Sequence, residues 1–147
     1  MLKHTNSPPV SPDRVVVMGA GGFVGGAIVA ALKARGVTTL ALSRKDVDLL
    51  APGAARALAA LLRPSDAFVA VSAIAPVKNV AMLHENLTMI AAMAEALQAR
   101  PVAHVLNIGS DAIYADFEGP LTENSCASPG GLHGIMGPNG AGKTTFF

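Results

Sequence analysis

Arg14-Val-Val-Val-Met-Gly19-Ala-Gly-Gly22-Phe-Val-Gly25 is the stretch of sequence that decides the fold. Its β-branched run is typical of a buried strand, and glycines recur at every third position directly after that run. Glycines at this spacing allow a sharp turn, a close approach of the backbone to a diphosphate, and tight packing of the following helix. The free N–H groups and the dipole at the start of that helix then favour an anion. The stretch therefore predicts a strand and helix that bind a dinucleotide, with a tight turn that binds nothing as the alternative.

Strands and helices are expected to alternate along the rest of the chain. Apolar runs predict strands, and helical spacing of apolar residues predicts the helices between them. The expected strands are 14–18, 38–42, 67–72 and 102–108, the expected helices are 23–35, 52–62 and 79–100, and a turn is expected at 64–66. This alternation indicates crossover connections between parallel strands. We therefore expect an α/β fold: a Rossmann-type doubly wound parallel sheet in three layers (αβα), truncated at its C-terminal side.

Composition sets limits on the class of protein. The chain has 147 residues, a formal net charge of +1 and only 14% charged residues, which suits one α/β domain with buried strands and gives no electrostatic reason to expect nucleic acid. The uncharged run 15–32 barely reaches the length of a membrane span, and its five glycines divide it, so we expect no membrane segment. Cys126 is the only cysteine, which favours a reducing, cytoplasmic location.

The end of the second expected strand bears on which dinucleotide is bound. An acidic residue at this point would bond the ribose 2′-OH, whereas a basic residue can pair with a 2′-phosphate. Ser43, Arg44 and Lys45 follow the strand here. A hydroxyl and two cations suit a phosphate, so we expect NADP in preference to NAD; the alternative is that these are solvated loop charges.

Three later segments, Asp46-Val-Asp-Leu49, Ser72-Ala-Ile-Ala75 and Ile108-Gly-Ser-Asp-Ala-Ile-Tyr114, join the glycine series in a wider pattern. Over about residues 14–134 the sequence resembles the extended short-chain dehydrogenase family of NAD(P)-dependent epimerases and dehydratases. The resemblance implies that the cofactor contacts Gly19, Gly22, Phe23, Val24 and Gly25 in the first turn and Ser43 and Arg44 after the second strand. It also implies that Asp48 and Leu49 lie beside the adenine, and that Ala73, Ile74 and Ala75 pass the ribose and phosphate region.

The same resemblance implies catalytic positions, and here the sequence departs from the family. Ser110 occupies the position of the family's catalytic Ser or Thr, four residues before Tyr114, and Asn86 falls where the family carries a helix asparagine. Ser110 would bond the substrate oxygen while a tyrosine transfers a proton and a lysine lowers that tyrosine's pKa. His133 stands at the tyrosine position and Gly137 at the lysine position. We therefore expect cofactor binding without efficient turnover of a nucleotide sugar or another small carbonyl or hydroxyl substrate.

The last residues carry a second phosphate motif. Gly137-Pro-Asn-Gly-Ala-Gly142-Lys143-Thr144 fits Gly-x-x-x-x-Gly-Lys-Ser/Thr and resembles the P-loop of ABC-transporter ATPases, with Lys143 for the phosphate oxygens and Thr144 for Mg²⁺. Only three residues follow it. We hypothesise that two unrelated coding segments meet near residues 132–134. Two alternatives stay open: an ATP-binding module that uses this P-loop, and a catalytically silent dinucleotide sensor.

The expected domain organisation follows from these segments. Residues 1–13 contain three prolines and are expected to be a disordered leader. Residues 14–134 are expected to form an incomplete dinucleotide-binding domain, and 135–147 a tail that is not a folded domain. We expect no resident metal centre. An open sheet edge favours pairing with another chain, for example in a homodimer.

Overall fold

Strands and helices alternate in the order that the sequence predicts. The computed structural model describes residues 11–109, 114, 120, 122, 124 and 125. The elements are β1 (Arg14–Met18), α1 (Phe23–Ala34), β2 (Thr39–Leu42), α2 (Ala54–Leu61), β3 (Asp66–Ala70), α3 (Val80–Ala99) and β4 (His104–Asn107). They form a four-stranded sheet in the order β2-β1-β3-β4, and every neighbouring pair is parallel. The predicted α/β class is confirmed.

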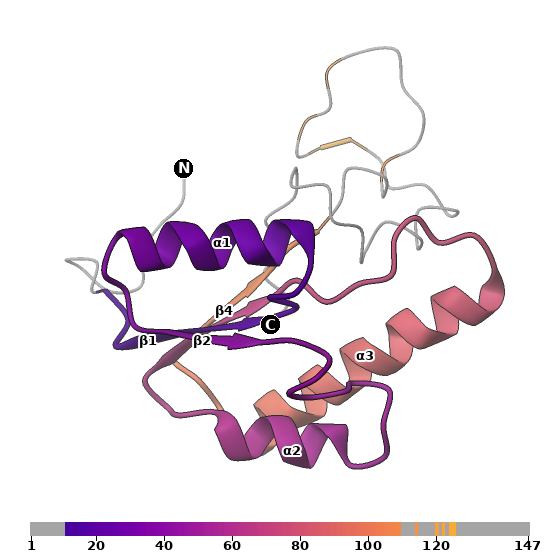
Figure 1. The fold of residues 1–147 in the computed structure, drawn as a ribbon. Coiled ribbons are helices and arrows are strands. Elements are labelled where there is room, and N and C mark those ends of the chain that lie inside the picture. Colours follow the sequence, from indigo (N-terminus) through magenta and orange to yellow (C-terminus); the bar gives the residue numbers. More distant parts are fainter. Residues whose placement is uncertain (1–10, 110–113, 115–119, 121, 123, 126–147) are drawn as a thin grey trace.

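Helices cover both faces of this sheet. Figure 1 shows α1 on one side and α2 with α3 on the other. Successive residues of a strand point to opposite faces, and β1 uses both. Val15 and Val17 belong to the cluster that packs with α1, whereas Val16 and Met18 belong to the cluster that contains residues of α2 and α3. The uninterrupted apolar run of β1 is thus explained by burial on both faces, and the predicted three layers are confirmed.

The order of the strands places a crevice at one edge of the sheet. From β1 the chain moves to β2 on one side, and then crosses to β3 on the other side of β1. The chain therefore leaves β1 toward β2 and leaves β3 toward β4, in opposite directions along the sheet. In such sheets ligands bind outside the carboxyl ends of the strands where this reversal occurs. The turns that follow β1 and β3 are the segments to inspect for a site.

A buried ion pair joins β1 to β3 at their amino ends, opposite the crevice. The Arg14 side chain donates to both carboxylate oxygens of Asp66, at 2.8 and 2.7 Å, and the two residues are register partners. Asp66 is fully buried, and the backbone N–H of Arg63 also donates to its carboxylate. Burial raises the pKa of the Asp66 carboxyl, but the bonds from Arg14 and Arg63 outweigh burial and hold that pKa below its ordinary value.

The predicted boundaries differ from the structure in a few places. Asp66, expected in a turn, is the first residue of β3, because Arg14 compensates its charge inside the sheet. The second helix starts at Ala54 rather than at 52, after Gly53, whose φ is +80°. Residues 11–13 of the expected leader are exposed and lie outside helices and strands. Within the described residues, no helix combines the length and the apolar character needed to cross a membrane.

Candidate functional site

Gly19 makes the turn at the carboxyl end of β1, and only glycine fits there. Its φ is +104°, a conformation that residues with a side chain rarely adopt. A Cβ at this position would also lie 2.8 Å from the backbone nitrogen of Ser72, which follows β3. The close approach of these two segments brings together the turns that follow β1 and β3.

The other two glycines of the series have different physical roles. A Cβ on Gly25 would overlap the carbonyl oxygen of Gly19, so this glycine lets α1 pack directly on the turn. A Cβ on Gly22 would lie 3.5 Å from its nearest neighbour, again the Gly19 oxygen, which is ordinary contact. The packing of the protein therefore does not require glycine at position 22. The bare backbone of Gly22 is exposed and lines a pocket, where it leaves room for a ligand.

The N-terminal end of α1 is left without a side-chain cap. Gly22 is the N-cap residue, and the first turn carries no acidic residue. The first N–H groups of a helix have no partners within the helix, and together with the helix dipole they favour an anion. The end of α3 differs, because the Asn79 side chain accepts a hydrogen bond from the Met82 N–H at 2.9 Å. The end of α1 next to the glycine turn is thus suited to a bound anion.

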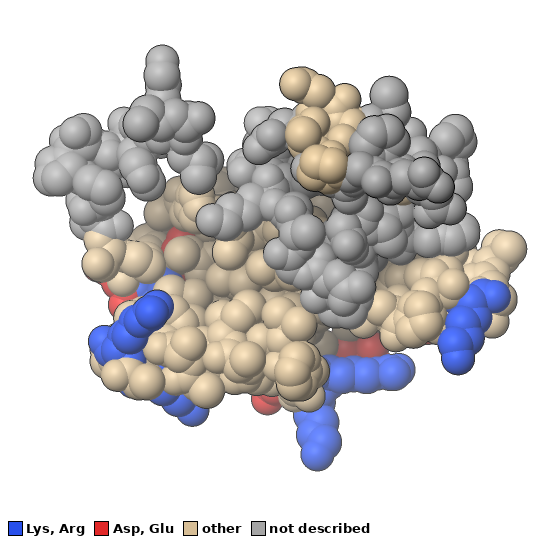
Figure 2. Space-filling model, turned by 90° about the horizontal axis from the view of Figure 1, so that it is seen from above, with Lys and Arg blue, Asp and Glu red and all other residues tan. Residues whose placement is uncertain are grey.

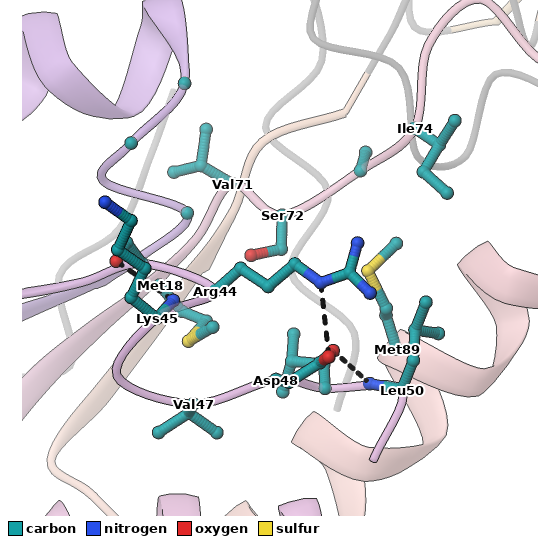
Figure 3. Close-up of a pocket in the computed structure, with 16 residues that line it drawn as sticks. Met18, Arg44, Lys45, Val47, Asp48, Leu50, Val71, Ser72, Ile74 and Met89 are labelled. Atoms are coloured by element: carbon teal, nitrogen blue, oxygen red, sulfur yellow. Dashed lines mark hydrogen bonds and ion pairs between the residues drawn. The ribbon is translucent and has the colours of Figure 1, made fainter.

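The pocket has a volume of about 420 Å³ and lies at the predicted crevice. Figure 3 shows its residues, which come from the glycine turn, the loop after β2, the segment after β3, and α3. Its floor is largely apolar, with Met18, Val71 and Met89 among the lining residues. Polar groups are added to the lining by Ser43, Arg44, Lys45, Asp48 and Ser72. A mainly apolar cleft with a few polar groups is typical of a small-molecule site.

Hydrogen bonds to the carboxylates of Asp46 and Asp48 fix the conformation of the loop after β2. The hydroxyl and the backbone N–H of Ser43 both donate to Oδ2 of Asp46, at 2.7 and 2.8 Å. These two bonds hold the pKa of the Asp46 carboxyl below its ordinary value, and the bond from the hydroxyl has the larger effect. Ser43 is therefore fixed as a donor to Asp46, and its side chain lines the pocket in that orientation.

Arg44 and Asp48 form an ion pair within the pocket lining. Nε of Arg44 lies 3.2 Å from Oδ2 of Asp48, while Oδ1 of Asp48 accepts from the Leu50 N–H at 3.1 Å. The bond from Leu50, together with the one from Arg44, outweighs partial burial and holds the pKa of the Asp48 carboxyl below its ordinary value. The Arg44 side chain is 76% exposed, and exposed pairs of this kind contribute little to stability. Arg44 can therefore exchange partners readily.

Hydrogen bonds from α3 anchor the segment after β3. Asn86 is one of two buried polar residues in the described part of the chain, and its side-chain amide bonds the backbone of Ile74. Ile74 in turn lines the pocket. The wall that Ala73 and Ile74 form is thus anchored to the helix beneath it.

The structure brings most of the predicted cofactor residues together. Those that line the pocket are Gly19, Gly22, Ser43, Arg44, Asp48, Leu49, Ala73 and Ile74. Phe23, Val24, Gly25 and Ala75 do not line it. The side chain of Phe23 is 94% exposed, yet residues 23–25 carry the first N–H groups of α1. These three residues add no side chain to the pocket lining, and their N–H groups belong to the first turn of α1.

The predicted catalytic and P-loop residues cannot be placed. Ser110, His133, Gly137, Gly142, Lys143 and Thr144 lie outside the described residues, as does Cys126. Tyr114 is described and half-buried, and it does not line the pocket. In the part of the chain that the structure describes, no three His, Cys, Asp or Glu side chains gather as they would around a metal ion.

Sequence reasoning missed the apolar floor of the pocket. Met18, Val47, Leu50, Val71 and Met89 line it, and none is predicted as a site residue. Nothing in the sequence around them distinguishes an apolar side chain of a pocket from one of the core. On the face seen in Figure 2, the lysine and arginine side chains of the described residues lie in separate groups around the periphery of the molecule.

Comparisons with known proteins place the fold and the family. The sequence matches the family described as NAD dependent epimerase/dehydratase over residues 15–135. No curated protein matches it. Among solved structures, UDP-N-acetylglucosamine 4-epimerase from Bacillus cereus is 19% identical with a TM-score of 0.69. The aligned region covers 86% of this chain and 47% of the epimerase chain.

Two further structures were solved with a dinucleotide. A GDP-L-fucose synthetase from Naegleria fowleri bound to NADP is 17% identical with a TM-score of 0.70, covering 92% of this chain and 45% of its own. A short-chain dehydrogenase/reductase superfamily protein from Agrobacterium tumefaciens with bound NAD is 22% identical with a TM-score of 0.63, covering 84% and 42%. The chain thus spans less than half the length of these three proteins. Since the family match covers most of its residues, the chain belongs to the NAD dependent epimerase/dehydratase family.

Proposed function

We propose that the chain binds a nicotinamide dinucleotide, with the diphosphate at the N-terminal end of α1. The observation that carries the proposal is the uncapped helix end beside a glycine whose missing side chain serves no packing need. Gly19 and Gly22 let the backbone approach the diphosphate, and Phe23, Val24 and Gly25 contribute N–H groups. The NAD complex and the NADP complex described above support this assignment.

The dinucleotide is NADP rather than NAD on this proposal. Arg44 follows β2, lines the pocket, and is held only by an exposed pair with Asp48. A guanidinium recognises a phosphate through two parallel N–H bonds, which a ribose hydroxyl cannot accept in the same way. Lys45 lines the same part of the pocket and adds positive charge. Asp48 and Leu49 lie beside the adenine, and Ala73 to Ala75 pass the ribose and phosphate region.

Catalysis is impaired on this proposal. Ser110 would still bond a substrate oxygen, but His133 and Gly137 stand at the tyrosine and lysine positions of the family's pattern. A lysine that lowers the pKa of the proton donor is then missing, and glycine offers no group to replace it. The substrate class is a nucleotide sugar, because the similar structures include a UDP-N-acetylglucosamine epimerase and a GDP-L-fucose synthetase. On the same proposal, the chain is cytoplasmic and forms a homodimer.

Calorimetric titration of the full chain with NADPH, NADH and Mg-ATP tests the proposal. We expect binding of NADPH, weaker binding of NADH, and no binding of Mg-ATP. In Gly22→Ala a methyl group fills the space left for the diphosphate, so both dinucleotides should bind at least about 10-fold more weakly. Gly26→Ala is the matched control: its Cβ would lie 3.6 Å from the Ala20 oxygen, in the same helix but outside the pocket lining.

Each alternative has its own outcome in this experiment. Tight Mg-ATP binding that Lys143→Ala abolishes would replace the proposal by the P-loop hypothesis. When a nucleotide sugar is added to the NADPH-bound chain, residual turnover would exclude the dinucleotide sensor. Equal affinities of wild type and Gly22→Ala for NADPH would contradict the site.

A further inference from the structure

The Arg44 side chain lies over the pocket. In Figure 3 it extends from the end of β2 across the view, with its guanidinium toward Asp48. Both residues belong to the pocket lining, and the pair joins Nε of Arg44 to Oδ2 of Asp48. A ligand that fills this pocket from the glycine turn to Leu50 therefore meets the pair.

The two partners are held differently. Asp48 is fixed to the backbone, because its other oxygen accepts from the Leu50 N–H at 3.1 Å. Its carboxyl pKa is held below the ordinary value, so Asp48 stays ionised at neutral pH. Arg44 is 76% exposed, and no hydrogen bond other than the one to Asp48 is made by its side chain within the described residues. When the pair opens, Arg44 is the partner that moves.

From this geometry we infer that the Arg44–Asp48 pair selects between NADP(H) and NAD(H), an inference that rests on the proposed dinucleotide site. Either dinucleotide displaces the Arg44 guanidinium from Asp48 on entering the pocket. NADP(H) supplies a 2′-phosphate that takes the place of the lost carboxylate. NAD(H) supplies no anion at that point, so its binding free energy is reduced by the full cost of breaking the ion pair. The pair therefore weakens NAD(H) binding, whereas the Arg44 guanidinium, once released, strengthens NADP(H) binding.

The ion pair and a simple phosphate contact predict different effects on NADH binding. If Arg44 only contacted the 2′-phosphate, removing its charge would weaken NADPH and leave NADH unchanged. Because the pair has to open when NADH binds, removing either partner removes the cost of breaking the ion pair and strengthens NADH binding. Exposed ion pairs are weak, so the expected gain in NADH affinity is about 2- to 5-fold.

Affinities of the full chain for NADPH and NADH, measured by calorimetry in Arg44→Ala, Asp48→Asn and the double variant, test the inference. Arg44→Ala should bind NADH about 2- to 5-fold more tightly and NADPH about 10-fold more weakly. Asp48→Asn should show the same gain for NADH. The double variant should gain no more than either single variant, because both remove one interaction.

Lys45→Ala is the matched control. Lys45 is the neighbouring cation in the pocket lining, and no salt bridge is recorded for it among the described residues. Its removal should weaken NADPH without tightening NADH. Unchanged or weaker NADH binding in Arg44→Ala would overturn the inference while leaving the proposed function standing, as would additive gains in the double variant. If wild type and all variants bind neither dinucleotide, the proposed function itself fails.

Discussion

Asn86 bonds both polar backbone groups of Ile74. Its Oδ1 accepts from the Ile74 N–H at 2.8 Å, and its Nδ2 donates to the Ile74 carbonyl oxygen at 3.0 Å. Asn86 is 1% exposed, so water cannot replace either bond. The pair joins α3 to the segment after β3, twelve positions earlier in the chain. A residue outside the pocket lining thereby sets the position of one that lines it.

We predict that Asn86→Leu destabilises the protein. The replacement leaves the N–H and the carbonyl of Ile74 without partners in a partly buried place, and each unsatisfied buried group costs about 1–3 kcal/mol. We therefore expect the free energy of unfolding to fall by about 2–4 kcal/mol in urea denaturation. Thr88→Ala on the same helix is the control, because its hydroxyl bonds only the His84 carbonyl within α3. Equal losses in the two variants would show that the bonds to Ile74 contribute nothing special.

Gly25→Ala tests the packing of α1 on the glycine turn. The added Cβ would overlap the Gly19 oxygen and lie 2.8 Å from the Gly19 carbonyl carbon, so the helix and the turn have to separate. Overpacking of this kind typically costs about 1–3 kcal/mol. We expect that loss in the free energy of unfolding, together with weaker dinucleotide binding. A variant as stable as wild type would mean that the turn adjusts freely.

Gly26→Ala should have the opposite effect on stability. This glycine lies inside α1, and a Cβ there makes only an ordinary contact of 3.6 Å with the Ala20 oxygen. Alanine is favoured over glycine in a helix by about 0.5–1 kcal/mol, so the midpoint of thermal unfolding should rise by a few degrees, to the order of 4 °C. A lower midpoint would show that the neighbouring glycines at positions 25 and 26 share one steric role.

Patterns of residues close together in the sequence were sufficient to predict the fold and the glycine turn of the candidate site. The apolar run predicts β1 with its observed bounds, and the glycine spacing predicts the turn that Gly19 and Gly25 make. These features depend on residues close together in the chain. The predictions of helices also held to within a few residues, because apolar spacing and a terminal glycine act locally.

What the sequence could not show depends on contacts between distant segments. Asp66 reads as a turn residue, because Arg14, which compensates the charge of its buried carboxylate, is 52 positions away. Met89 reads as core on a helical face, although it also lines the pocket. The Arg44–Asp48 pair has an i, i+4 spacing outside any helix, so periodicity gives no reason to expect it.

The buried Arg14–Asp66 pair leads to the final prediction, which concerns acid. The pKa of the Asp66 carboxyl is lower in the folded protein than in the unfolded chain, so folding favours the ionised form. Its stabilising effect is therefore present above the unfolded value, about pH 3.9, and is lost as the pH falls through the lower folded value. Asp66→Asn leaves Arg14 without its charged partner and should cost about 3–5 kcal/mol at pH 7.

Urea denaturation of wild type and Asp66→Asn from pH 7 to pH 2 measures this effect. The difference in unfolding free energy between the two proteins should stay constant down to about pH 4 and shrink below it, because protonation makes the wild-type side chain neutral like asparagine. Asp13→Asn, at an exposed position, controls for the loss of a charge. A difference that persists unchanged at pH 2 would mean that the geometry of the carboxyl group, rather than its charge, holds the two strands together at this edge.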